Sequence, residues 1–139
     1  MIRPAKQTDL DTILRIHREN FERPWTDEQL IAELKQSNRR FFVAESDARI
    51  QGYLIASILS GEAELLSIAV EKSYQRQGIA SELLNALLVS IQSATLFLEV
   101  SRLNEAAISF YRKHGFQEIA IRRNYYQDKS DALIMRLSD

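Results

Sequence analysis

The chain has 139 residues, of which 45% are hydrophobic and 27% charged, as is typical of a globular protein of one domain's length. Its formal net charge is −1 at pH 7, so no excess charge favours nucleic acid or an anionic membrane as a partner. The lack of cysteine excludes disulfides, a thiolate nucleophile and a cysteine-ligated metal, and the two histidines, His17 and His114, lie too far apart in sequence to form a metal-ligand motif. No apolar run approaches the length of about 18 residues that a membrane span requires, so we expect a cytoplasmic protein.

The N-terminal part of the chain is expected to form a short strand and two helices. Residues 2–4 are typical of an edge strand, and Thr8 or Asp9 is expected to cap the first helix. One face of that helix carries Leu10, Ile13, Leu14, His17 and Phe21. On this apolar face, the histidine is interpreted as packed and hydrogen-bonded. Residues 26–29 form a capping box for the second helix, which is expected to end within residues 37–40.

The rest of the chain alternates between short apolar runs and helical periods. The expected elements are strands at 41–45, 50–59 and 62–70, a helix from 79 to about 93, a strand at 95–100, a helix that begins at Arg102 or Asn104 and ends before Gly115, and strands at 116–121 and 132–137. The strand, helix and strand between 62 and 100 predict one parallel crossover, and the other connections predict antiparallel hairpins. The fold class is therefore α+β: a mixed, mostly antiparallel sheet of roughly six or seven strands with helices on both faces.

The segment between the strand at 62–70 and the next helix has the composition of an anion-binding loop. Gly78 lies directly before the helix, where the first backbone N–H groups lack intrahelical partners and the helix dipole favours negative charge. A side chain at this position would hold a phosphate away from the backbone, and Arg76 adds a charged donor. Taken alone, a single glycine before a helix is equally typical of an ordinary turn.

Two further side chains are candidates for acid–base chemistry. Glu99 follows the apolar run 96–98, where a carboxylate is costly unless it is paired or functional, and Tyr111 lies on the helix that follows. In a crossover fold the carboxylate and the phenol could face one cleft. From spacing alone, a strand-end salt bridge for Glu99 and a core-edge aromatic for Tyr111 remain open.

Two motifs together resemble the GNAT superfamily of N-acetyltransferases. Residues 75–80, Gln-Arg-Gln-Gly-Ile-Ala, are similar to that family's Q/R-x-x-G-x-G/A acetyl-CoA loop. Residues 104–116 resemble its second signature, N-x-x-A-x-x-(F/L)-Y-x-x-x-G-F, and both motifs occur in the family's order. The resemblance covers nearly the whole chain and implies one GNAT-like domain over residues 1–139, with acetyl-CoA as the acetyl donor and no metal.

Further segments are similar to the RimI-type ribosomal-protein-alanine acetyltransferases, which act on the N-terminal amine of a small-subunit ribosomal protein. These segments are Phe21 with Pro24-Trp25-Thr26, and residues 67–70, 74–78, 98–100 and 121–126. This resemblance implies a proton acceptor at Glu99 and a proton donor at Tyr111. It implies acetyl-CoA contacts at Ile68, Ala69, Val70, Arg76, Gln77, Gly78, Ile79, Ala80, Ser81 and Asn104. The chain departs from that pattern at Ser101 and Leu103, and its segment after residue 126 is shorter, which affects the acceptor side.

The residues that would bind the acceptor amine, the acceptor side of the site, are less determined by the sequence. Trp25, Tyr125 and Tyr126 are possible walls of a peptide groove, although Trp25 could simply pack under the Pro24 turn. If Tyr125 and Tyr126 continue a strand, one ring points inward and one outward. Arg122 and its neighbour at 123 could attract an acidic partner, but such charges are usually solvated surface. Two other functions remain open: acetylation of a small amine such as a polyamine or an antibiotic, and a CoA-binding module without activity.

Overall fold

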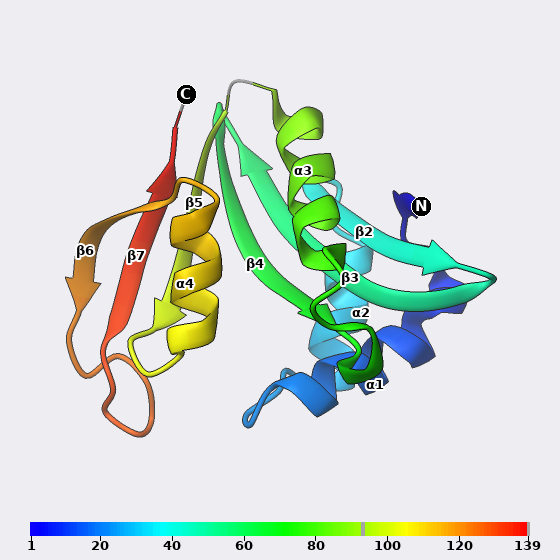
Figure 1. The fold of residues 1–139 in the computed structure, drawn as a ribbon, viewed down its shortest axis with the longest axis horizontal. Helices are drawn as coiled ribbons and strands as arrows, with labels where there is room; N and C mark the ends of the chain where they lie inside the picture. Colours follow the sequence, from blue (N-terminus) through cyan, green and yellow to red (C-terminus); the bar gives the residue numbers. More distant parts are fainter. Residues whose placement is uncertain (93, 139) are drawn as a thin grey trace. The chain divides into compact units, whose positions relative to one another are not determined.

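The computed structural model describes residues 1–92 and 94–138. The elements are β1 (Ile2–Pro4), η1 (Gln7–Asp9), α1 (Leu10–Asn20), α2 (Asp27–Leu34), β2 (Arg39–Ser46), β3 (Arg49–Leu59), β4 (Glu62–Val70), η2 (Lys72–Tyr74), α3 (Ile79–Ile91), β5 (Thr95–Ser101), α4 (Glu105–Lys113), β6 (Gln117–Arg122) and β7 (Ala132–Leu137). Over the described residues the strands form a seven-stranded sheet in the order β1-β2-β3-β4-β5-β7-β6, with β4 and β5 as its parallel pair (Figure 1). The predicted fold class is confirmed.

The chain divides into two compact units. The first unit comprises Met1–Ile58 and Leu66–Gln92, and the second comprises Leu59–Leu65 and Ser93–Asp139. Strand β4 therefore contributes its C-terminal half to the first unit and its N-terminal half to the second. That the whole chain acts as one domain stays a prediction. Within the described ranges, no helix has the length and apolarity needed to cross a membrane.

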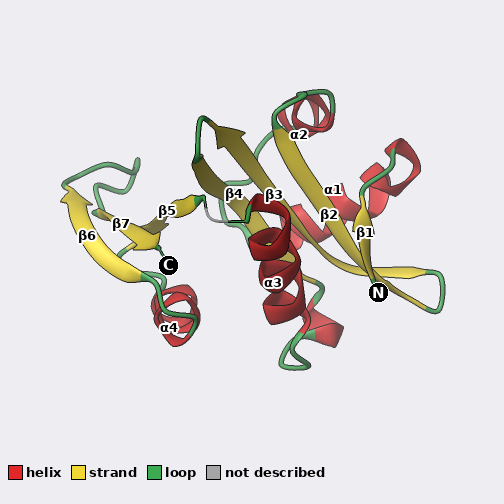
Figure 2. Ribbon diagram, turned by 90° about the horizontal axis from the view of Figure 1, so that it is seen from above, coloured by secondary structure: helices red, strands yellow, loops and turns green. Residues whose placement is uncertain are grey.

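The first unit has helices on both faces of its strands. Helices α1 and α2 lie on one face and α3 lies on the other (Figures 1 and 2). The side of the core that includes α1 and α2 is formed by Ile13, Leu14, Ile16, Leu30, Phe41, Val43, Ile50, Tyr53, Ile55 and Ala69. The helical spacing of the α1 residues and the period of two along β2 and β3 place these apolar groups on facing surfaces.

Local sequence signals fixed several element ends correctly. The Thr26 hydroxyl accepts the Gln29 N–H at 3.1 Å, and the Gln29 side chain accepts the Thr26 N–H at 2.8 Å, which confirms the capping box. Asn104 caps α4 by accepting the Ala107 N–H at 3.1 Å. Gly115, with φ of 94°, ends α4 in the left-handed conformation expected of a C′ glycine.

Three expected boundaries differ from the structure. Asp9 precedes α1 but makes no side-chain cap, because its carboxylate pairs with Arg3 at 2.9 Å and accepts the Lys6 N–H. Helix α2 ends at Leu34, before the expected residues 37–40. Strand β2 already begins at Arg39, which pairs with Ser57 of β3. Helix α3 ends at Ile91, and the expected end near residue 93 falls outside the described residues.

A buried chain of hydrogen bonds crosses the core of the first unit. His17 on α1 is 2% exposed, and its Nε2 accepts the backbone N–H of Trp25 at 2.9 Å. The ring proton therefore resides on Nδ1, which donates to the Tyr53 hydroxyl at 2.6 Å. A further hydrogen bond of 2.9 Å joins this hydroxyl to the Ser67 hydroxyl on β4. The predicted packed and hydrogen-bonded histidine is confirmed, and the chain ties α1 and the loop after it to β3 and β4.

The buried position of His17 predicts a stability that depends on pH. Burial lowers the pKa of His17, followed in effect by the charge of Arg18, so the unfolded chain takes up this proton at a higher pH than the folded one. The free energy of unfolding should therefore fall as pH decreases below about 6.5, with a slope approaching about 1.4 kcal/mol per pH unit. Urea unfolding between pH 7.5 and 5 measures this slope.

Two variants assign the effect to one ring. His17→Phe should be less stable at pH 7.5, because Tyr53 and the Trp25 N–H lose a partner, but the slope from this ring should vanish. His114→Gln serves as the matched control and should keep the pH dependence that His17 causes. A slope in His17→Phe equal to that of the parent protein would contradict the assignment.

Candidate active site

In the first unit, the turn before α3 contains two residues in the left-handed backbone conformation. Arg76 and Gly78 both adopt positive φ, at 64° and 82°. Gly78 is the N-cap residue of α3 and has no side chain, so it does not itself cap the N–H groups of the first turn. A Cβ built on Gly78 would meet nothing within 4 Å, so the backbone here borders open space. This arrangement fits the phosphate end of a nucleotide-containing ligand.

The predicted contact residues around this turn differ in exposure. Arg76 and Gln77 are exposed, whereas Ala80 and Ser81 are half-buried. The side chain of Ile79 is only 6% exposed, so this residue can offer a ligand little beyond its backbone. The predicted site at this turn is therefore mainly one of backbone amides, with Arg76 as the flexible cation beside them.

The end of β4 is held in place by two amide side chains. The Val70 carbonyl accepts hydrogen bonds from Gln75 Nε2 at 3.0 Å and from Asn20 Nδ2 at 3.3 Å. Gln75 Nε2 also lies 3.2 Å from Asn20 Oδ1, so the turn, α1 and β4 are joined at one carbonyl. Sequence reasoning did not identify Asn20 as part of this arrangement, because its partners are distant in the chain.

Gly52 is a second residue that the sequence analysis missed. A Cβ on Gly52 would lie 2.7 Å from the Ala69 carbonyl oxygen, a distance that a side chain cannot adopt. The glycine therefore allows the backbone of β3 to approach the buried Ala69 and Val70. An isolated glycine within an apolar strand pattern is the sequence signal that could have revealed this close approach.

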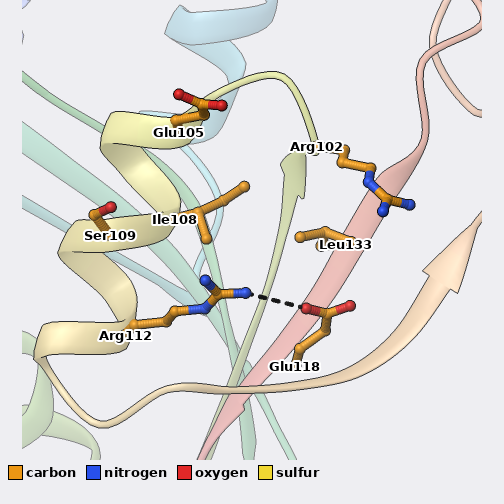
Figure 3. Close-up of a pocket in the computed structure, with 7 residues that line it drawn as sticks. All are labelled: Arg102, Glu105, Ile108, Ser109, Arg112, Glu118 and Leu133. Carbon is orange, nitrogen blue, oxygen red and sulfur yellow. Dashed lines mark hydrogen bonds and ion pairs between the residues drawn. The ribbon is translucent and has the colours of Figure 1, made fainter.

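In the second unit, α4 covers one face of the strands β5 and β7 (Figure 2). The even-numbered residues of β5 are buried, and Val100 pairs with Leu133 of β7. Leu133 and Ile108 of α4 line a cavity of about 400 Å³ together with Arg102, Glu105, Ser109, Arg112 and Glu118 (Figure 3). An ion pair of 3.4 Å between Arg112 and Glu118 borders this cavity. None of the predicted site residues lines it.

Glu99 lies on the other face of β5, within a cluster of polar and aromatic side chains. Its side chain is 25% exposed and its carboxylate is 3.5 Å from the Arg122 guanidinium. The negative charge of this carboxylate raises the pKa of Tyr125. Arg122 in turn lies over the Tyr125 ring, 5.3 Å from its centroid. The strand-end salt bridge that the sequence left open is therefore present.

Tyr111 lies on the α4 side of the same strands. It is 8% exposed and contacts the rings of Phe110 and Phe116, each with centroids 5.5 Å away. Burial raises the pKa of Tyr111 to about 12, so the phenol keeps its proton through the neutral range. Glu99 and Tyr111 thus project from opposite faces of the second unit's strands, and the structure does not bring them side by side.

The three predicted acceptor-side aromatic residues have different surroundings. Trp25 is half-buried and packs against the core of the first unit, 5.5 Å from the His17 ring. Tyr125 is 49% exposed and Tyr126 is half-buried. Both tyrosines lie in the loop after β6 and not in a strand, because Asn124 adopts a positive φ of 53°. No cluster suited to a metal ion occurs among the described residues.

Comparison with known proteins identifies the class. The model of the acetyltransferase (GNAT) family matches residues 10–116. The chain therefore belongs to the GNAT family, and it is an acetyl-CoA-dependent N-acetyltransferase. The predicted donor, acetyl-CoA, agrees with this family, and an acetyl-CoA complex occurs among the structures with the same fold.

Two relatives place the chain more narrowly within the family. It is 34% identical to the [ribosomal protein bS18]-alanine N-acetyltransferase of Escherichia coli, over 98% of this chain and 95% of that protein. It is also 34% identical to an N-alpha-acetyltransferase of Sulfurisphaera tokodaii, over 96% of this chain and 90% of the relative. The crystal structure of the Escherichia coli ribosomal-protein-alanine enzyme superposes with a TM-score of 0.92 at 33% identity, covering 99% of this chain and 92% of that one. The predicted similarity to ribosomal-protein-alanine acetyltransferases is confirmed.

The turn before α3 offers a matched pair of glycine variants. Gly78 and Gly61 have φ of 82° and 81°, and a Cβ on either would meet nothing within 4 Å. Gly78→Ala and Gly61→Ala should therefore cost similar stability, about 1 kcal/mol each. Only Gly78→Ala should weaken donor binding, raising KM for acetyl-CoA about tenfold, because its methyl group projects where phosphate oxygens would approach the amides. Thiol-release kinetics measure KM for acetyl-CoA in both variants. Equal KM values would remove Gly78 from the donor site.

Proposed function

We propose that this acetyltransferase modifies the N-terminal α-amine of a protein, with alanine of a small-subunit ribosomal protein as the foremost candidate. The observation that carries the proposal is the near-full-length similarity to two relatives, one named for ribosomal protein alanine and the other for N-alpha acetylation. The polar cluster around Glu99, with an exposed tyrosine beside the carboxylate, supports a site that receives an amine from solvent.

The chemistry of the acceptor favours an α-amine over a lysine side chain. Acetyl transfer requires the amine in its neutral form, and the reference pKa of an α-amine is about 7.7–8.0 against about 10.4 for lysine. Deprotonation near pH 7 is therefore cheaper for the α-amine by roughly 2.5 pKa units, or about 3.4 kcal/mol. A single carboxylate can meet this smaller demand, directly or through one water molecule.

On the donor side, the proposal assigns acetyl-CoA to residues that the family resemblance and the local geometry both support. The backbone amides at Arg76–Ser81 would hold the phosphates, since the turn is open and has no side-chain cap. Backbone amides of Ile68–Val70 would polarise the thioester carbonyl. Asn104 is assigned as a further contact, although its side-chain oxygen already caps α4. When bound, acetyl-CoA supplies the acyl group for direct attack by the amine.

Glu99 and Tyr111 are assigned the two proton transfers. Glu99 would accept the proton of the acceptor amine, and the Tyr111 hydroxyl would donate to the departing thiolate. Because Tyr111 stays protonated, it is always available as a donor, but burial makes it a weak acid and its position must supply most of its effect.

A substrate comparison tests the proposed function directly. The protein is incubated with acetyl-CoA and peptides that begin with Ala, Ser or Met, and in parallel with lysine and polyamines. We expect thiol release and N-terminal acetylation with the alanine peptide, verified by mass spectrometry of the product. Turnover with polyamines alone would instead assign a small-amine enzyme, and binding of acetyl-CoA without any turnover would indicate a binding module.

Two isosteric variants test the assigned proton transfers. Glu99→Gln should lower kcat by about 100-fold at pH 7 and by less at pH 9, where more of the amine is already neutral. Tyr111→Phe keeps the packed ring and should lower kcat by a similar factor, with KM for acetyl-CoA unchanged.

Glu118→Gln, on β6, is the carboxylate control and should retain the activity of the parent. Unfolding midpoints of all variants show whether any loss reflects misfolding. If Glu99→Gln and the parent have equal rates across the pH range, Glu99 is not the base.

A further inference from the structure

The loop between α1 and α2, residues 21–26, is held near both of its ends by His17. The backbone carbonyl of His17 accepts the Phe21 N–H at 3.2 Å, and its ring Nε2 accepts the Trp25 N–H at 2.9 Å. The same ring contacts both aromatic side chains of the loop, with centroids 4.8 Å from Phe21 and 5.5 Å from Trp25. The conformation of this loop therefore depends on the direction in which one imidazole points.

The core of the first unit fixes that direction. Nδ1 of His17 donates to the Tyr53 hydroxyl at 2.6 Å, and a hydrogen bond of 2.9 Å joins this hydroxyl to Ser67. Among residues 1–92 and 94–138, the buried polar or charged side chains are Asp9, His17 and Ser67, so two of the three belong to this chain of hydrogen bonds. Such groups are costly to bury unless each is paired. The pairing gives the ring one tautomer and aims its lone pair at the loop.

The surroundings of the ring also keep it neutral at pH 7. Burial lowers the pKa of His17, and the charge of Arg18, the next residue on α1, lowers it further. A neutral imidazole has one acceptor nitrogen, whereas a protonated one has none. The hydrogen bond from the Trp25 N–H to Nε2 is therefore made by the form of the ring that is present under physiological conditions.

The two ends of this chain lie beside residues to which the function gives roles. Trp25, at one end, is a candidate wall of the groove that receives the acceptor peptide. Ser67, at the other end, directly precedes Ile68–Val70, the segment of β4 assigned to the thioester. His17 itself is 2% exposed, so it can act on binding only through the loop and not by touching a substrate.

We propose that His17 is a positioning residue for acceptor binding, which holds residues 21–26 and the Trp25 side chain in the conformation that receives the N-terminal peptide. Loss of the acceptor nitrogen frees the Trp25 N–H and lets the loop leave the core, while the turn before α3 keeps its own contacts at Asn20 and Gln75. Binding of the acceptor is then weakened and binding of acetyl-CoA is not. The inference rests on the proposed function and on Trp25 as part of the acceptor side.

Trp25 is the only tryptophan of the chain, so its fluorescence reports on the loop without a label. At pH 8, His17→Phe should raise acrylamide quenching of this fluorescence about twofold, because local opening of the loop exposes the indole. His17→Gln is the conservative variant, since its side-chain oxygen can accept the Trp25 N–H in place of Nε2, and its quenching should stay near the parent's. Far-UV circular dichroism verifies that each variant is folded.

Steady-state kinetics at pH 8, with acetyl-CoA and an N-terminal alanine peptide, test the effect on the acceptor. His17→Phe should raise KM for the peptide about tenfold and leave kcat and KM for acetyl-CoA within about twofold of the parent's values. His17→Gln should restore most of the peptide KM. Ile13→Val, in the same core, is the stability control: it should lower the unfolding midpoint and change neither KM.

Tyr53→Phe provides a second variant that keeps the packed ring. It removes the hydroxyl that orients His17, so quenching and the peptide KM should change in the same direction as in His17→Phe, with the KM rising about threefold. If His17→Phe does not fold, values of Tyr53→Phe equal to the parent's overturn the proposal.

A peptide KM equal to the parent's in folded His17→Phe would overturn the proposal even if quenching increased, because the loop would then have no part in acceptor binding. An equal rise in the KM of acetyl-CoA, or a tenfold rise in the peptide KM of Ile13→Val, would overturn it by showing a general loss of structure. Failure of the proposed function shows separately, as a parent protein that acetylates another amine but not the alanine peptide. The same KM comparison with that amine then decides the role of His17.

Discussion

The alternation of side chains along β5 determines which groups can meet in the second unit. Leu98 and Val100 point into the core beneath α4, so Glu99 must point to the other face. The same rule, applied through the register with β7 and β6, brings Arg122 to the Glu99 side and leaves Tyr111 on the side of α4. A shift of β5 by one residue would exchange these faces and bury the carboxylate.

The first unit uses its polar groups differently. Its buried chain from the Trp25 N–H through His17 and Tyr53 to Ser67 satisfies groups that would be costly to bury alone. At the end of β4, Asn20 and Gln75 share one carbonyl oxygen, which joins the strand to the turn that precedes α3. Two amide side chains thus hold the end of β4 and the turn before α3 together.

Membership of the GNAT family and the local geometry support different parts of the functional picture. The matches to the family and to the bS18-alanine enzyme give the reaction and its donor. They do not say what surrounds each group in this chain. The ion pair of Glu99 with Arg122, and the position of Arg122 over the Tyr125 ring, come from the structure alone.

The sequence by itself determined the element order, the parallel crossover, the capping box at Thr26, the glycine end of α4 and the family, because each depends on local spacing or a short motif. It misplaced the start of β2, where pairing with β3 outweighs the polar composition of Arg39 and its neighbour. Only the tertiary structure decided that Gly52 is needed against Ala69, that Asn20 holds Val70, and that Arg122 crosses β7 to Glu99. These contacts join residues that are far apart in the chain, and only the packing of α1 and the strands against one another brings them together.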